Sequence, residues 1–273
     1  MKSKFTIILF AVYSATNFAS AQHAHLHTDS KWDECSFQLD PSLTQSEWHQ
    51  FAAEAGNVIY FRPLTDAKPM GVGRFELSVL QWNTKIDENE NAWNNTFVHP
   101  DSSHWLIDGP ELPFPGLTLR AGVTKKIDAG IYWSERPGAN YGVWGAQVQY
   151  NFFNDTARKF SASTRINFSA LYGPDDLNLN VYGVDLIASK EFKLYSKWLS
   201  ISPYATVSPF LSHAHEKTDA VDLHDETLFG MQGAIGAVAK ISCVRLGVEY
   251  NMARVNTLSY KLGVVINSKG KKE

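Results

Sequence analysis

The chain of 273 residues carries 25 Lys and Arg against 28 Asp and Glu, which gives a formal net charge of -3 at pH 7. Because the basic residues are dispersed along the chain, we expect no nucleic-acid partner. After the N-terminus, no stretch approaches the ~20 consecutive apolar residues that a membrane-spanning helix needs, which excludes a helical membrane protein.

The first 21 residues have the features of a cleaved secretory signal peptide. Lys2 and Lys4 make a basic start, residues 5–13 form an apolar run, and residues 19–21 (Ala-Ser-Ala) form a small-residue cleavage pattern. The apolar run is shorter than a spanning helix. We therefore expect cleavage before Gln22 and export of the mature chain.

Residues 22–70 differ in character from the rest of the chain and contain one helix signal. Thr44 and Glu47 have the spacing of a capping box. Apolar residues then line one face, and Gly56 is placed to end the helix. The pattern predicts a helix over 44–55 and a short strand over 58–61. We interpret 22–70 as a segment that caps or plugs the periplasmic side of the following domain.

From residue 71 onward, apolar and polar residues alternate with a period of two, which is typical of strands with one apolar and one polar face. The segment 199–211 is weakened by Pro203 and Pro209, each of which removes a ladder donor. The expected strands are 71–84, 115–124, 127–135, 141–153, 160–172, 177–190, 199–211, 226–240, 243–253 and 257–268.

Charged residues in these strands fall on only one of the two alternating faces, which distinguishes a membrane barrel from a soluble sandwich. A charge on a lipid-facing surface near the bilayer midplane costs ~2–4 kcal/mol, so a bilayer imposes such segregation. We therefore predict that the charged face lines a lumen. Its members include Arg120, Asp128, Arg165, Asp185, Arg245, Glu249 and Lys261.

The connections and the strand ends favour the same interpretation. The two longest connections, 85–114 and 212–225, both fall on the side opposite to the short turns, which is the usual asymmetry between outer loops and periplasmic turns. Aromatic residues cluster near strand ends, as in the girdles of membrane proteins. An even strand count places the C-terminus, with its polar tail 269–273, on the periplasmic side.

Together, the signal peptide and residues 71–268 resemble bacterial outer-membrane β-barrel proteins. The predicted fold is all-β: an antiparallel transmembrane β-barrel of about 10 strands (range 8–12) with a short N-terminal helix. The resemblance implies residence in the bacterial outer membrane, with outer-membrane lipid around the barrel. A soluble periplasmic barrel or sandwich is the alternative.

Candidate sites have two interpretations each. The lumen charges either line a permeation path or form a structural network, since a barrel of about eight strands is filled by its own side chains. His213, His215 and His224 are the densest group of candidate metal ligands, or else an ordinary polar loop. Cys35 and Cys243 either form a disulfide, with Cys243 facing the lumen, or are two free thiols. We expect no cofactor.

The first functional hypothesis is a narrow pore or small-solute transport protein. The alternative is a non-conducting envelope protein that acts on a cell-surface partner through its outer loops or N-terminal segment. A lipid-modifying outer-membrane enzyme is a third hypothesis. Ser, His and Asp are present in no catalytic spacing, so we expect no enzymatic activity. The pattern indicates no oligomeric state.

Overall fold

The computed structural model describes residues 36–87, 89–98, 111–135, 139–194, 198–219 and 221–268. The predicted signal peptide and the predicted polar tail 269–273 lie outside these residues. Among the described residues, no helix has the length and apolar character needed to cross a membrane.

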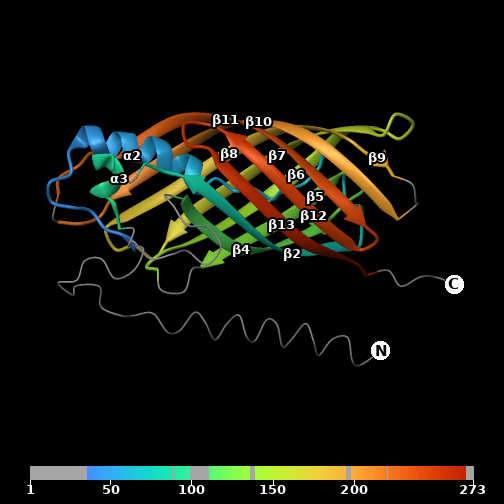
Figure 1. Cartoon of the computed structure of the whole chain (residues 1–273), viewed down its shortest axis with the longest axis horizontal. Helices are drawn as coiled ribbons and strands as arrows, with labels where there is room; N and C mark the ends of the chain where they lie inside the picture. Colours follow the sequence, from blue (N-terminus) through green and yellow to red (C-terminus); the bar gives the residue numbers. More distant parts are fainter. Residues whose placement is uncertain are drawn as a thin grey trace, which may run out of the picture. The chain divides into compact units, whose positions relative to one another are not determined.

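Ten antiparallel strands form a closed barrel (Figure 1). β11 pairs with β12 on one side and with β10 on the other, which closes the ring. The prediction of an all-β barrel of about ten strands is therefore confirmed. The strands are β2 (Arg74–Lys85), β4 (Glu111–Gly122), β5 (Ile127–Glu135), β6 (Gly142–Asp155), β7 (Phe160–Tyr172), β8 (Leu177–Lys190), β10 (Leu199–Glu216), β11 (Glu226–Ile241), β12 (Val244–Met252) and β13 (Thr257–Asn267).

Successive side chains of a strand point to opposite faces. Because apolar and polar residues alternate along each strand, the apolar side chains lie together on the exterior of the barrel. In the middle of β7, Ile166 is 65% exposed, while the preceding Arg165 is buried. Ile166 lies beside Val148 of β6 and Val184 of β8, which are also exposed. The same alternation recurs around the ring, so exposed apolar side chains form a belt around the barrel, while the buried charged side chains of the strands face inward.

The two prolines that weakened one predicted strand lie in β10, the longest strand of the barrel. The β10–β8 ladder begins at Tyr204, just after Pro203, and it is interrupted between Val207 and Phe210, where Pro209 lies. On the other edge, β10 pairs with β11 without a break. The two prolines, which lack a backbone N–H, are therefore tolerated because the β10–β8 ladder is absent at the first and interrupted at the second.

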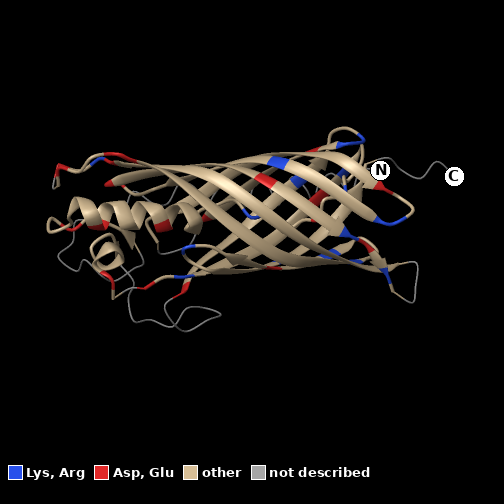
Figure 2. Ribbon diagram, turned by 90° about the horizontal axis from the view of Figure 1, so that it is seen from above, with Lys and Arg blue, Asp and Glu red and all other residues tan. Residues whose placement is uncertain are grey.

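The barrel has two unlike ends. The turn end carries the connections 123–126, 156–159, 191–198 and 242–243, and the two-residue strand β9 (Phe192–Lys193) pairs with β10 there. The opposite loop end carries the two longest connections, 86–110 and 217–225. Acidic residues gather at the loop end and basic residues at the turn end (Figure 2). The described turn-end connections contain Lys125, Lys126, Arg158, Lys159 and Lys193, against the single acid Glu191.

Helix α2 (Gln45–Val58) begins with the predicted capping box. The Thr44 backbone N–H donates to the Glu47 carboxylate at 2.8 Å, and the Thr44 hydroxyl accepts from the Glu47 N–H. The first of these bonds is the main cause of the lowered pKa of Glu47. The predicted end at Gly56 is wrong. The helix continues to Val58, and Gly56 instead permits close packing, because a Cβ there would stand 2.8 Å from the Ser212 Cβ.

Helix α2 lies at the loop end, and not at the turn end that the sequence analysis assigned to the periplasm. The Trp48 indole donates to the carbonyl oxygen of His224 at 3.1 Å, and His49 contacts Glu226 at 2.9 Å. Because β2 begins at the turn end, the chain must pass from one end of the barrel to the other between Val58 and Arg74. We call residues 59–70, which make this passage, the lumen segment.

A small hydrophobic cap completes the loop end. The strands β1 (Ser36–Phe37) and β3 (Phe97–Val98) pair with each other, and helix α3 (Asn91–Asn94) contacts α2. The Trp93 indole donates to Glu54 of α2 at 2.6 Å. Rings packed within about 6 Å of one another fill the cap; they are Phe37, Trp48, Phe51, Trp93, Phe97 and Tyr141.

Two glycine substitutions test whether the barrel wall is shaped around the lumen segment. A Cβ at Gly183 would stand within 2.7 Å of three atoms of Tyr60, whereas a Cβ at Gly233, on the exterior, would meet nothing closer than 3.8 Å. We expect Gly183→Ala to destabilise the barrel by about 1–3 kcal/mol, the usual cost of overpacking. Gly233→Ala should be close to neutral. Urea unfolding midpoints would measure both, and equal midpoints would contradict the proposed fit.

Candidate functional site

The lumen segment first meets a network centred on Asp185 of β8. The Tyr60 hydroxyl donates to Asp185 at 2.8 Å, and Arg165 and Asn167 of β7 donate to the same carboxylate at 2.6 and 2.7 Å. Ser208 of β10 donates to it as well. All five side chains are buried. The carboxylate is therefore compensated by one buried cation and several hydrogen bonds, as a charge inside a barrel requires.

Arg62 occupies the interior next to this network with 1% of its surface exposed. Its guanidinium donates to the carbonyl oxygens of Asn57 and Tyr60 and to the Gln232 amide oxygen at 3.2 Å. It also lies 5.7 Å from the centre of the Trp82 ring, within the range of a cation–π contact. No carboxylate of the described residues forms an ion pair with it. Backbone carbonyls and ring faces therefore hold this cation.

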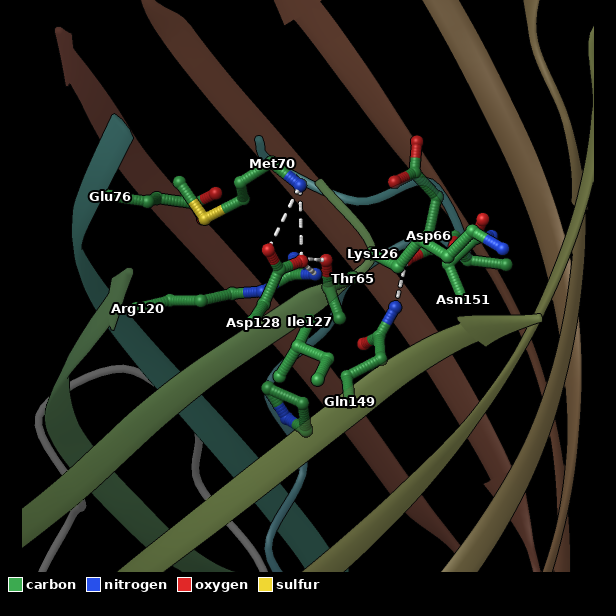
Figure 3. A network of polar contacts seen from close by, with 12 residues as sticks. Thr65, Asp66, Met70, Glu76, Arg120, Lys126, Ile127, Asp128, Gln149 and Asn151 are labelled. Carbon is green, nitrogen blue, oxygen red and sulfur yellow. Dashed lines mark hydrogen bonds and ion pairs between the residues drawn. The ribbon is translucent and has the colours of Figure 1, made fainter. Parts of the chain in front are cut away.

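Further towards the turn end, Asp128 of β5 fixes the end of the lumen segment (Figure 3). The Met70 backbone N–H donates to both oxygens of Asp128 at 3.0 and 3.1 Å. Arg120 of β4 donates to Asp128 and to the Thr65 hydroxyl. In the same view, the Gln149 amide donates to the Asp66 carbonyl oxygen at 3.2 Å. Both backbone and side-chain atoms of the segment are thus bonded to the wall.

Three ion pairs complete the contacts at the turn end. Lys240 donates to Asp66, Lys68 donates to Glu191 at 2.8 Å, and Lys261 donates to Glu76 at 2.7 Å. Lys261 also donates to the Pro63 carbonyl oxygen at 3.1 Å.

Glu191 lies in the connection after β8, and its pKa is lowered by its cationic neighbours. Burial by itself raises the pKa. The Lys68 ammonium, which donates to the carboxylate, and the positive charge of Lys240 outweigh burial and hold the pKa below its ordinary value. Glu191, at the turn-end mouth of the lumen, is therefore charged at neutral pH.

The seven residues predicted to line the lumen lie on the inward-facing side of the barrel wall. Arg120, Asp128, Arg165, Asp185, Glu249 and Lys261 are each no more than 6% exposed. Glu249 accepts from the Tyr204 hydroxyl at 2.6 Å, so it also has a partner within the wall. Arg245 is half-buried and lines a cavity at the turn end.

The segment 22–70 was expected to cap or plug the barrel, but residues 59–70 were not singled out from the sequence as the part that enters the lumen. The predicted strand over 58–61 does not form, because Val58 ends α2 and the following residues enter the lumen. A signal was present: Tyr60, Arg62 and Asp66 are polar residues placed between an apolar helix face and the first strand. These residues precede strands whose inward-facing side carries many charges. A polar segment in that position can supply hydrogen-bond and ion-pair partners to those charges.

The histidine group has no complete metal-ligand set. His213 and His215 lie on β10 and not in the predicted loop, and both face Asp225, at 3.9 and 2.6 Å. His224 contacts Gln45 and Trp48 through its backbone. No cluster of three potential ligands occurs within the described parts of the chain. A structural site needs about four convergent ligands.

The prediction for Cys35 lies outside the described residues. Cys243 does not face the lumen as predicted. It is an exposed free thiol in the two-residue connection 242–243 at the turn end. Ser36, the first described residue, pairs with Val98 at the loop end.

With this geometry established, comparisons with known proteins show a likeness of fold. No protein family and no curated protein matches the chain. Among solved structures, it is similar to the β domain of the Bordetella autotransporter BrkA (10% identity, 72% of this chain and 99% of that chain covered, TM-score 0.40). It is also similar to LpxR from Salmonella typhimurium (12%, 69% and 99%, TM-score 0.36) and to Ail of Yersinia pestis (11%, 71% and 99%, TM-score 0.25).

Further similar structures include the KdgM porin and the N-terminal barrel domain of OprF from Pseudomonas aeruginosa. The predicted barrel architecture is confirmed by the closed ring of strand pairings in this chain itself.

The Asp185 network allows a direct test of how the lumen segment is held. Asp185→Asn keeps the side-chain volume but removes the charge that compensates buried Arg165. Breaking one side of a buried ion pair costs about 3–5 kcal/mol, so we expect a loss of that size in urea unfolding. Arg158→Ala removes an exposed partner of Asp155 and should cost less than about 1 kcal/mol. Equal losses would contradict the central role of Asp185.

Proposed function

We propose that the protein is a non-conducting outer-membrane β-barrel whose lumen is closed by its own residues 59–70, and that it acts through its capped loop end. The observation that carries this proposal is the occupation of the lumen. Residues of this segment bond to wall side chains on β4, β5, β6, β8, β11 and β13.

The exterior belt supports the membrane location. Exposed apolar side chains such as Ile166, Val148 and Val184 lie side by side across three strands. Soluble monomers rarely expose apolar patches beyond a few hundred Å², whereas a lipid-facing barrel requires such a belt. The asymmetry of the connections supports an orientation with the loop end outside the cell and the turn end in the periplasm.

The dimensions of the lumen segment support closure rather than a narrow path beside it. Twelve extended residues span at most about 40 Å, which exceeds the ~25 Å height of the apolar band of such barrels. Barrels of about eight strands have an interior that side chains fill by themselves, and open porins have about 16–18 strands. A ten-stranded wall that also encloses a peptide segment leaves little room for a solute.

The loop end is the surface through which such a closed barrel would meet a partner. The cap formed by α2, α3 and the β1–β3 pair covers the mouth with a packed aromatic core. Acidic residues predominate in the described connections around it; they are Asp87, Glu90, Asp175, Asp176, Asp219, Asp222 and Asp225. We infer a binding role for this end, and the partner chemistry that its charge favours is cationic.

Planar-bilayer conductance separates closure from the pore hypothesis. We expect the refolded mature chain to give no conductance steps, because the lumen segment fills the path. A variant that lacks residues 22–70 should conduct if it folds, since removal of the segment opens the interior. Heat-modifiable migration on a gel would show that each form is folded.

Steady current through the folded, full mature chain would overturn the proposal and restore the narrow pore. Silence from both forms would leave closure in place and assign it partly to the wall side chains. The expected absence of enzymatic activity is a separate prediction that this experiment does not address.

A charge introduced on the exterior tests the membrane location. Ile166→Arg places a cation in the middle of β7, and in lipid it should destabilise the barrel by ~2–4 kcal/mol. Ala157→Arg introduces the same charge in an exposed connection at the turn end and should be close to neutral. Unfolding from lipid vesicles would measure the difference. A neutral Ile166→Arg, together with solubility without detergent, would favour the soluble barrel.

A further inference from the structure

A cavity of about 260 Å³ opens at the turn end of the barrel, beside the end of the lumen segment. The cavity lies at the opposite end of the barrel from the cap. Ligand binding in it would require neither the partner nor the closed lumen proposed above. Its volume is several times the ~30 Å³ share of one water molecule in the liquid. It lies below the ~300–1,000 Å³ range of pockets for drug-sized ligands. A small group, and not a large solute, fits this space.

The walls of the cavity are strongly basic. The cationic side chains that line it are Lys68, Arg74, Arg120, Lys240, Arg245 and Lys261. Four of these are neutralised in ion pairs: Lys68 with Glu191, Lys240 with Asp66, Lys261 with Glu76, and Arg120 with Asp128.

The remaining two cations, Arg74 and Arg245, form no ion pair within the described parts of the chain. Arg74 of β2 is exposed, and Arg245 of β12 is half-buried. The two residues flank β13, with Arg74 paired to Asn267 and Arg245 to Gly263. Asp66, Glu76 and Glu191 also line the cavity, but each of these carboxylates is paired with a lysine. The two guanidinium groups therefore leave the cavity with an excess of positive charge.

We propose that this cavity binds a phosphate group and that the guanidinium groups of Arg74 and Arg245 contact the phosphate oxygens. The planar guanidinium fork matches the oxygen geometry of phosphate and binds it through paired, charge-assisted hydrogen bonds. A doubly charged anion balances the two unpaired cations. The lysines of the surrounding turns add a positive field that attracts anions to this end.

The phosphate group has two sources with the same chemistry. One is free phosphate or a small phosphate ester in solution. The other is the headgroup of an anionic phospholipid in the adjacent leaflet, which cationic residues at a membrane surface attract. Trp198 lines the cavity and is 61% exposed, and amphipathic rings favour the headgroup level.

The first experiment titrates inorganic phosphate into the refolded mature chain in a non-ionic detergent, with binding measured by calorimetry. We expect Arg245→Gln and Arg74→Gln each to weaken phosphate binding at least tenfold. The matched control is Arg158→Gln, which removes one cation from the same end. Arg158 is exposed and does not line the cavity, so its substitution should change the affinity less than twofold.

The second experiment separates the two sources. The wild type and Arg245→Gln are placed in nanodiscs of phosphatidylcholine with a fraction of phosphatidylglycerol, and retained lipid is counted by native mass spectrometry. Retention of phosphatidylglycerol by the wild type, but not by Arg245→Gln, would assign the site to a lipid headgroup. Phosphate binding in detergent without selective lipid retention would assign it to a soluble phosphate.

Two results would overturn the proposal. One is the absence of both phosphate binding and selective lipid retention in the folded wild type. The other is an equal loss of binding in Arg158→Gln and Arg245→Gln, because that would show a diffuse electrostatic attraction and no cavity site. Heat-modifiable migration serves as the folding control for every variant. Conductance plays no part in this test, so its outcome is independent of the closed-lumen proposal.

Discussion

The structure depends on one constraint: a charged group that is buried inside a narrow barrel needs partners there. Asp185 shows how the constraint is met. Its carboxylate accepts from Arg165, from Asn167 and from Tyr60, which comes from outside the barrel wall. The wall and the lumen segment therefore share one set of interior hydrogen bonds and ion pairs, in which each supplies partners to the other.

This complementarity connects the two ends of the molecule. The cap anchors α2 at the loop end, so residues 59–70 must cross the barrel to reach the start of β2. Their path is fixed by side chains in the middle and by the Met70 backbone bonds to Asp128 at the turn end. Where the segment leaves the lumen, it meets more cations than it can neutralise. The passage of residues 59–70 through the lumen and the basic cavity are thus two consequences of the same arrangement.

The electrostatic asymmetry of the barrel gives each end a different chemistry. Acidic connections surround the aromatic cap, and basic turns surround the cavity that Arg74 and Arg245 line (Figure 2). A membrane barrel with this polarity presents cations to one leaflet and anions to the opposite surface. The two proposed roles, binding at the capped end and capture of phosphate at the other, use this separation of charge without any passage between them.

The sequence by itself determined the barrel. Lipid outside and polar groups inside impose an alternation with a period of two on every strand, and this alternation is visible in the local sequence. It also determined the start of α2, since Thr44 and Glu47 form their cap within one turn. It could not place the helix, show that the helix continues past Gly56 to Val58, or show where Cys243 points. Those features depend on contacts between distant residues, such as Gly56 with Ser212 and Tyr60 with Asp185. Only the tertiary structure decided that residues 59–70 fill the lumen.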